Sequence, residues 1–184
     1  MKTSDMEIAL MKKLDIRRNL IVPNIHWSML AYEADLVVLT KSNYATEIEI
    51  KVSKADLKKD KEKRHFHDSI YFKYFYYAVP HSLQDFALTE IPDEAGLYVV
   101  RESGRTNCVR KAKERSDYKK WTDEERTKLA ELGCMRIQGL KQKIAKAEER
   151  IKRKNEIIKQ QEDMISVADE LIKKMEKHFE GCSL

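Results

Sequence analysis

The sequence predicts an α/β domain followed by a long coiled-coil helix. Residues 5–115 alternate helix-forming stretches with β-prone stretches, as in a domain built of helices packed on a sheet. The chain from about 134 to 179 contains no proline and little β signal, and isoleucine recurs in it every seven residues. We therefore expect a core over 1–116, a short connecting helix over 117–133 and a coiled-coil helix over 134–184.

Composition limits the classes of partner and compartment. A net charge of +5 and a pI near 8.9 mildly favour an anionic partner. The sequence has no secretory apolar segment and no apolar run of about 18 residues, so we expect no membrane association. Cys108, Cys134 and Cys182 follow no motif spacing, which predicts a reduced, cytoplasmic setting.

The first half of the core predicts one helix and three strands. Ser4 and Glu7 have the spacing of a capping box and start the helix. Pro23 makes the first strand an edge strand or a bulged one. The predicted elements are a helix over 4–18, strands over 20–27, 33–40 and 45–53, and a turn over 41–44.

The second half predicts alternating helices and strands. Ser53 is a suitable N-cap for the helix that follows it. Thr122 and Glu125 repeat the capping-box spacing, and Gly133 can end the helix that they start. The predicted elements are helices over 54–66, 82–87 and 122–132, and strands over 71–79, 96–101 and 109–113.

The strand over 45–53 alternates polar and apolar residues without a break. Successive side chains of a strand point to opposite faces. We expect the apolar members to face the core: Ile48, Ile50 and Val52. The charged members share the other face: Glu47, Glu49 and Lys51. This charged row is either a solvated sheet face with cross-strand ion pairs or the start of a metal-dependent active site.

A second acidic residue favours the active site. Asp35 lies in the preceding strand, and an antiparallel pairing would bring its carboxylate within about 5 Å of a same-face neighbour such as Glu49. Two carboxylates that close repel unless a cation lies between them, and Mg²⁺ prefers oxygen ligands of this kind. Lys51, two residues from Glu49, could orient a water molecule and stabilise a phosphate.

These residues resemble a known family. Glu33-Ala34-Asp35 followed by Glu49-Ile50-Lys51 resembles the bipartite motif of the PD-(D/E)XK nuclease superfamily. With Asp56, Asp60, 75–80 and 95–100 added, residues 5–115 resemble more narrowly the MmcB-like DNA-repair group and related phage proteins. Alanine stands at Ala34, where the motif has proline.

The resemblance implies a restriction-endonuclease-like core and a metal-dependent deoxyribonuclease. Such an enzyme would act in DNA repair, recombination or phage DNA processing, in a bacterial or phage-infected cell, with Mg²⁺ or Mn²⁺. Asp35 and Glu49 would bind the metal, the Ile50 carbonyl would be a further ligand, and Lys51 would be the catalytic lysine. Glu7 on the first helix is either another metal ligand or only a helix cap. Two further carboxylates are candidate accessory ligands: Glu33 and Glu47.

Two basic clusters are candidate DNA contacts. Lys54, Lys58 and Lys61 lie at helical spacing directly after Lys51. The second cluster consists of Arg105, Arg110, Lys111 and Lys113, of which Arg110 and Lys111 are the predicted DNA contacts. The alternative is that these residues belong to ordinary solvated faces, as most charge runs do.

The C-terminal segment carries the heptad repeat. Isoleucine occupies one seam position: Ile137, Ile144, Ile151, Ile158, Ile165 and Ile172, with Phe179 in register. Lys154 and Gln161 place polar groups at the second seam position, which can fix register. We expect homo-oligomerisation through 137–179; the alternative is a single exposed helix with ion pairs along its surface.

Two other classes of function compete with the nuclease. One is a catalytically inactive nuclease-fold protein that binds DNA or assembles through its coiled coil. The other is a coiled-coil scaffold in which the charged strand face is mere surface. Cleavage of DNA that depends on Asp35 and Lys51 separates both from the enzyme.

Overall fold

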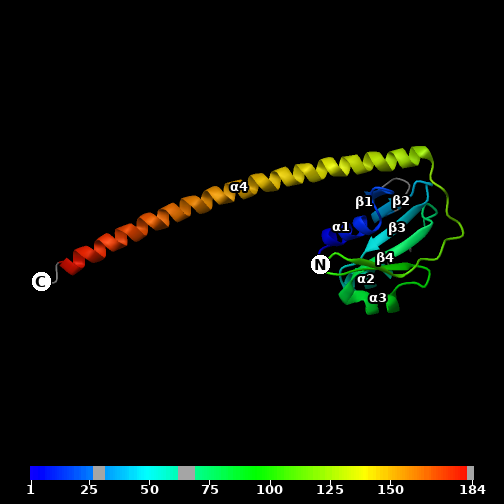
Figure 1. The fold of residues 1–184 in the computed structure, drawn as a ribbon, viewed down its shortest axis with the longest axis horizontal. Coiled ribbons are helices and arrows are strands. Elements are labelled where there is room, and N and C mark those ends of the chain that lie inside the picture. Colours follow the sequence, from blue (N-terminus) through cyan, green and yellow to red (C-terminus); the bar gives the residue numbers. More distant parts are fainter. Residues whose placement is uncertain (27–31, 62–68, 182–184) are drawn as a thin grey trace. The chain divides into compact units, whose positions relative to one another are not determined.

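The computed structural model describes residues 1–26, 32–61 and 69–181, and it confirms an α/β architecture (Figure 1). A six-stranded mixed sheet in the order β1-β2-β3-β4-β5-β6 is flanked by helices, and a long helix, α4, follows. The strands are β1 Leu20–His26, β2 Glu33–Leu39, β3 Ala45–Ile50, β4 Tyr74–Pro80, β5 Gly96–Val100 and β6 Thr106–Arg110. The helices are α1 Thr3–Lys13, α2 Lys54–Lys61, the 3₁₀ turn η1 His81–Leu83, α3 Gln84–Glu90 and α4 Asp123–Gly181.

Strand β3 lies in the middle of the sheet, between β2 and β4, and the strand directions decide which strand ends lie beside its carboxyl end. Strands β1, β2 and β3 pair antiparallel, β3, β4 and β5 pair parallel, and β6 returns antiparallel. Parallel neighbours need a crossover, which α2 supplies between β3 and β4 and α3 supplies between β4 and β5. The carboxyl ends of β3, β4 and β5 therefore meet at one edge.

Helix α1 covers one side of the sheet, here called the α1 face. Met6 and Leu10 of α1 pack there with Ile48 and Ile50, as the alternation in β3 predicts. The prediction for Val52 is wrong: β3 ends at Ile50, and Val52 is 36% exposed.

The opposite side, here called the α2 face, carries α2, α3 and the beginning of α4. Leu57 of α2 packs with Phe75 and Val79 of β4. Leu129 of α4 packs with Val37 of β2 in a neighbouring cluster. Because Val37, Glu47 and Phe75 are register partners across three strands, the two clusters lie on the same face.

The beginning of α4 is fastened to the sheet. The Trp121 indole N–H donates to the Tyr71 carbonyl at 2.6 Å, and Arg126 Nη1 donates to the Thr40 carbonyl at 2.9 Å. The predicted capping box is confirmed, because the Thr122 amide donates to Glu125 Oε2 at 2.9 Å and the Glu125 amide to Thr122 Oγ1 at 3.2 Å. This segment is thus part of the folded core.

Helix α1 differs from its prediction at both ends. It ends at Lys13 rather than 18, because the chain turns at Asp15, whose φ of 54° is left-handed. It begins at Thr3, and the Asp5 carboxylate accepts the Lys2 amide at 3.0 Å, so the Ser4–Glu7 cap is wrong.

Most predicted strands are present, with shifted ends. Strand β1 lies at a sheet edge and has a left-handed residue, Asn24, next to Pro23, as the proline predicts. Strand β4 begins at Tyr74 rather than 71, and β6 covers 106–110 rather than 109–113. Residue 27, predicted as the end of the first strand, lies outside the described residues.

Helix α4 continues where a break was predicted. Gly133 lies inside α4, and a Cβ at that position would meet Val22 Cγ2 at 3.4 Å, so the glycine permits close packing on β1. The chain divides into two compact units, Met1–Met135 and Arg136–Leu184. No helix in the described part of the chain is long and apolar enough to cross a membrane.

Trp121→Ala should destabilise the first unit by about 3–5 kcal/mol, because it empties a buried site and removes an indole hydrogen bond. Urea denaturation followed by circular dichroism measures the change in the free energy of unfolding. Ile8→Ala is the matched control, because Ile8 is 55% exposed and should change that free energy by less than about 0.5 kcal/mol. Equal effects of both variants would contradict the packing described here.

Candidate active site

The charged row of β3 is buried. Glu49 is 2% exposed and Lys51, directly after β3, is 4% exposed. Both lie inside the sheet, since β2 and β4 flank β3. The interpretation of this row as a solvated surface is therefore wrong.

The Lys51 ammonium bridges two carboxylates. Its Nζ lies 2.7 Å from Glu49 Oε1 and 2.9 Å from Asp60 Oδ1. The Tyr77 hydroxyl donates to the other oxygen of Asp60, Oδ2, at 2.7 Å. Tyr77 is also the β4 register partner of Glu49, so the four groups form one compact network.

The network changes the proton affinity of its members. Burial on its own lowers the pKa of the Lys51 ammonium, but Glu49 and Asp60 outweigh burial and raise that pKa above its usual 10.5. Burial, followed by the hydrogen bond to Asp60, raises the pKa of the Tyr77 phenol. Lys51 is therefore charged and Tyr77 neutral over the physiological range of pH.

Asp35 touches the same stretch of β3 from the neighbouring strand. The Ile50 amide donates to Asp35 Oδ2 at 2.8 Å. The β2–β3 register includes Leu36 opposite Ile48, and its next step along both strands is Asp35 and Glu49. The antiparallel pairing on which the sequence hypothesis depends is confirmed. Asp35 is half-buried, whereas Glu49 and Lys51 are buried.

Glu7 contacts β1 rather than the carboxylates of β3. Its Oε1 accepts a hydrogen bond from Asn24 Nδ2 at 3.4 Å. Asn24 lies opposite Asp35, between the Pro23–Leu36 and Ile25–Ala34 pairs of the β1–β2 register. Within residues 1–26, 32–61 and 69–181, no three Asp, Glu, His or Cys side chains are grouped to hold a metal ion. Glu7, Asp35 and Glu49 are thus not brought together as a ligand trio.

The two accessory carboxylates differ in environment. Glu47 is fully buried, and its Oε2 accepts the Tyr32 hydroxyl at 2.8 Å. Burial and this neighbouring carboxylate raise the pKa of the Tyr32 phenol. Glu33, at the start of β2, is exposed.

The predicted DNA-contacting lysines of α2 differ in whether the structure describes their side chains. Lys54 and Lys58 are exposed on α2, with their ammonium groups 5.1 and 5.7 Å from the Phe86 ring centroid. The Lys61 side chain and residues 62–66 of the predicted helix lie outside the described residues. Ser53 caps α2 as predicted, because its Oγ accepts the Asp56 amide at 3.1 Å.

The second basic cluster is partly structural. Arg110 Nε donates to the Ala95 carbonyl at 2.9 Å and its Nη2 to the Pro92 carbonyl at 2.6 Å. These bonds hold the turn before β5 in place, and DNA contact by Arg110 stays a prediction. Lys111 is exposed.

Three residues of the network and its surroundings were not predicted as functional: Tyr32, Asp60 and Tyr77. Asp60 follows Leu57 by three residues on a helix whose other polar side chains are largely exposed, so helical spacing could have placed it on the buried side. Tyr77 alternates in phase with Phe75, which predicts a core position but not the bond to Asp60.

Comparison with known proteins supports the fold. The chain resembles the solved structure of SPO1766, a protein of unknown function from Silicibacter pomeroyi, with a TM-score of 0.54 and 20% sequence identity. The match covers 72% of this chain and 86% of that one. No family model and no curated protein matches the chain.

Lys51→Met should lower the free energy of unfolding by about 3–5 kcal/mol at pH 7, because it leaves two buried carboxylates without their ammonium partner. Lys54→Met replaces an exposed side chain of α2 and should change the free energy of unfolding by less than about 0.5 kcal/mol. Urea denaturation of the three proteins measures both changes.

The pH dependence has a defined sign. A raised pKa in the folded state means that the Lys51 contribution is complete below about pH 10.5 and is lost as the pH rises through the folded pKa. The difference between wild type and Lys51→Met should therefore shrink as the pH rises above about 10.5, because the wild type then loses its ammonium charge. A difference that grows above about pH 10.5 would contradict the charged network.

Proposed function

We propose that the chain is a metal-dependent deoxyribonuclease with a core of the restriction-endonuclease type, as the PD-(D/E)XK-like motif implies. The observation that carries the proposal is the buried Glu49–Lys51 pair at the end of β3, with Asp35 bonded to the intervening Ile50 amide. An acid, a second acid and a lysine are thereby held on adjacent strands. Repair, recombination or phage DNA processing is the proposed setting.

The donor set fits a divalent metal as a two-carboxylate site. Asp35 and Glu49 face each other at the step that follows the Leu36–Ile48 pair of the β2–β3 register, and hard oxygen donors suit Mg²⁺ or Mn²⁺. Mg²⁺ commonly takes one or two protein carboxylates and completes its shell with water and substrate phosphate. The Ile50 carbonyl would be a third ligand. A cation held there would offset phosphate charge and favour ionisation of water.

The protein's own groups would orient the substrate. The Lys51 ammonium would donate to a non-bridging phosphate oxygen and offset the charge that develops during hydrolysis. Three exposed lysines would contact neighbouring phosphates: Lys54, Lys58 and Lys111. Such contacts bind DNA without reading its sequence, so affinity should fall as salt rises.

Asp35→Asn, Glu49→Gln and Lys51→Met should each lower the rate of DNA cleavage in Mg²⁺ or Mn²⁺ by about 100-fold or more. Single-stranded, duplex and branched DNA are incubated with each protein, and products are separated on denaturing gels. Glu131→Gln, on the exposed surface of α4, is the matched control and should cleave like wild type. Full cleavage by Asp35→Asn and Glu49→Gln would refute the proposed site.

The alternative is a catalytically inactive protein of the same fold that binds DNA or assembles. The engagement of Lys51 with both Glu49 and Asp60 favours it, because this ammonium already has two anionic partners. Salt-dependent DNA binding by the wild type without cleavage of any of the three substrates would select this alternative. No binding and no cleavage would favour a scaffold.

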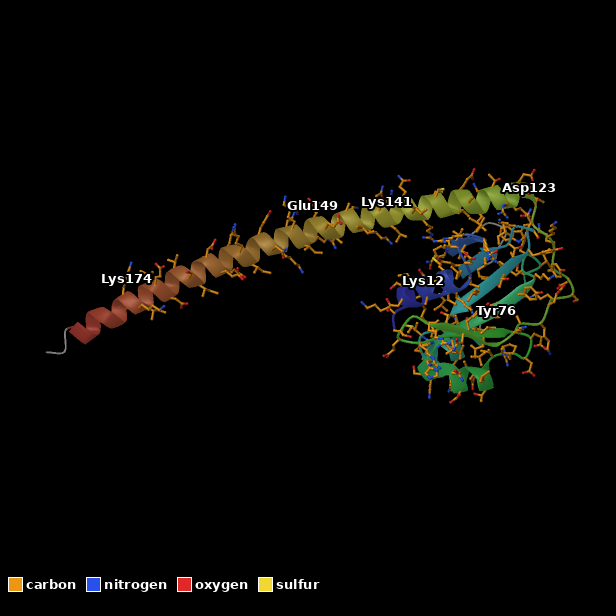
Figure 2. All side chains as sticks on the ribbon, in the orientation of Figure 1. Lys12, Tyr76, Asp123, Lys141, Glu149 and Lys174 are labelled. Carbon is orange, nitrogen blue, oxygen red and sulfur yellow. The ribbon has the colours of Figure 1, made fainter. Side chains whose placement is uncertain are left out.

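We further propose that the second unit pairs with a second copy of this chain. Its seam isoleucines are exposed, with Ile144 at 57%, Ile151 at 59% and Ile158 at 51%. Figure 2 shows the side chains around Lys141, Glu149 and Lys174 projecting from one continuous helix. A seven-residue stripe drifts around a straight helix by about 20° per heptad, so only a supercoiled helix of the same period follows it throughout. A second copy of this chain has a helix with the same seven-residue repeat and the same length, so it can cover the whole stripe.

The pairing is tested with a double substitution in the seam. Ile151→Asp together with Ile158→Asp should convert the oligomer into a monomer, because it places carboxylates in the apolar seam. Sedimentation velocity measures the mass over a range of concentrations. Lys152→Asp with Lys159→Asp changes charge outside the seam and should leave the oligomer intact. A monomeric wild type at high concentration would refute the pairing.

A further inference from the structure

We infer that Asp60 is a positioning residue for the Lys51 ammonium and that Tyr77 fixes Asp60 in turn. This inference rests on the proposed nuclease function, in which Lys51 touches the substrate phosphate. Neither Asp60 nor Tyr77 belongs to the bipartite motif of Asp35, Glu49 and Lys51, and the narrower resemblance that includes them implies no role for either. The fold brings both to the site.

The contacts connect Tyr77, Asp60, Lys51 and Glu49 in that order. Asp60 uses its two oxygens for different partners, Oδ1 for the Lys51 ammonium at 2.9 Å and Oδ2 for the Tyr77 hydroxyl at 2.7 Å. The ammonium also contacts Glu49 Oε1 at 2.7 Å. Lys51 is therefore held by two elements, through Glu49 of β3 and through Asp60 of the crossover helix α2.

Burial makes these contacts restrictive. The side chains of Lys51, Glu49 and Asp60 are 5%, 3% and 1% exposed, so water can replace little of what the carboxylates provide. A lysine side chain has a flexible four-carbon stem, and one ion pair leaves its head free to swing about that partner. A second carboxylate from another element removes this freedom. Asp60 thus fixes where the ammonium can donate its remaining hydrogen.

The packing of helix α2 on the sheet places the Asp60 carboxylate beside Lys51. Leu57 and Asp60, three residues apart, are buried, whereas the other side chains described over 54–60 are exposed or half-buried. Leu57 packs against β4 beside Tyr77. The Tyr77 hydroxyl prevents Asp60 from rotating, because one carboxylate oxygen is already committed to it. An aspartate at this point has a shorter stem than a glutamate and so fewer rotamers to lose.

The effect of losing Asp60 should fall on the chemical step. Phosphate contacts by exposed lysines would set DNA affinity, whereas a misplaced Lys51 would weaken only the stabilisation of developing charge. Asp60→Asn keeps size and hydrogen-bonding capacity and removes the charge. It should lower kcat by about tenfold or more and leave KM within about twofold. Tyr77→Phe should lower kcat less, also without changing KM.

Asp56→Asn is the matched control, because Asp56 lies on the same helix outside the network. It should leave kcat and KM within about twofold of wild type. Thermal unfolding of every variant identifies any that fails to fold, in which case Tyr77→Phe, which removes a single oxygen atom, carries the test.

Acetylation of lysines, followed by mass spectrometry, gives a readout that does not depend on cleavage. Lys51 should react far more slowly than Lys54 in wild type, and Asp60→Asn should speed the Lys51 reaction about tenfold or more at constant pH. Lys73, whose side chain is 17% exposed and paired with Glu114, reports general loosening and should not change. A uniform increase at Lys51 and Lys73 would indicate a merely structural role and overturn the inference.

The outcomes separate this inference from the function on which it rests. Cleavage by wild type that Lys51→Met abolishes and Asp60→Asn leaves unchanged would overturn the inference and support the nuclease. Absence of cleavage in wild type would refute the nuclease and, with it, the positioning role of Asp60 in cleavage. Loss of kcat in Asp60→Asn together with selective labelling of Lys51 would support both.

Discussion

A lysine ammonium held between two carboxylates, almost out of contact with water, is the constraint on which the site depends. Removing these three charges from water costs several kcal/mol per ion, and their attraction repays that cost only with close geometry and further hydrogen bonds. The 2.7 and 2.9 Å contacts and the Tyr77 hydroxyl supply those conditions. An apolar cluster of equal size would stabilise the fold as well. We infer that the charges are retained for chemistry or specificity rather than for stability.

The topology of the sheet brings these charged groups together. The parallel step from β3 to β4 requires a crossover, and α2 in that crossover brings Asp60 over Lys51. The antiparallel step from β2 to β3 brings Asp35 to the Ile50 amide. Packing by α1 on the other face fixes Ile48 and Ile50, and so fixes the direction of the charged side chains between them.

The sequence predicts those features that depend on local period. It predicts the alternation in β3, the Thr122–Glu125 cap and the order of helices and strands. It does not predict features set by tertiary contact. Asp15 ends α1 through a left-handed turn, and Gly133 continues α4 because it fits against Val22. The bond between Asp60 and Tyr77 joins residues that only the folded sheet brings together.

The proposed nuclease function requires Asp35 and Glu49 to bind a metal ion beside Lys51. Anomalous diffraction from crystals of the full chain grown with Mn²⁺ would locate that ion. We expect a manganese peak coordinated by both carboxylates, with the Lys51 ammonium still bonded to Asp60. Crystals in Mn²⁺ that show no peak there, with Glu49 paired only to Lys51, would contradict it.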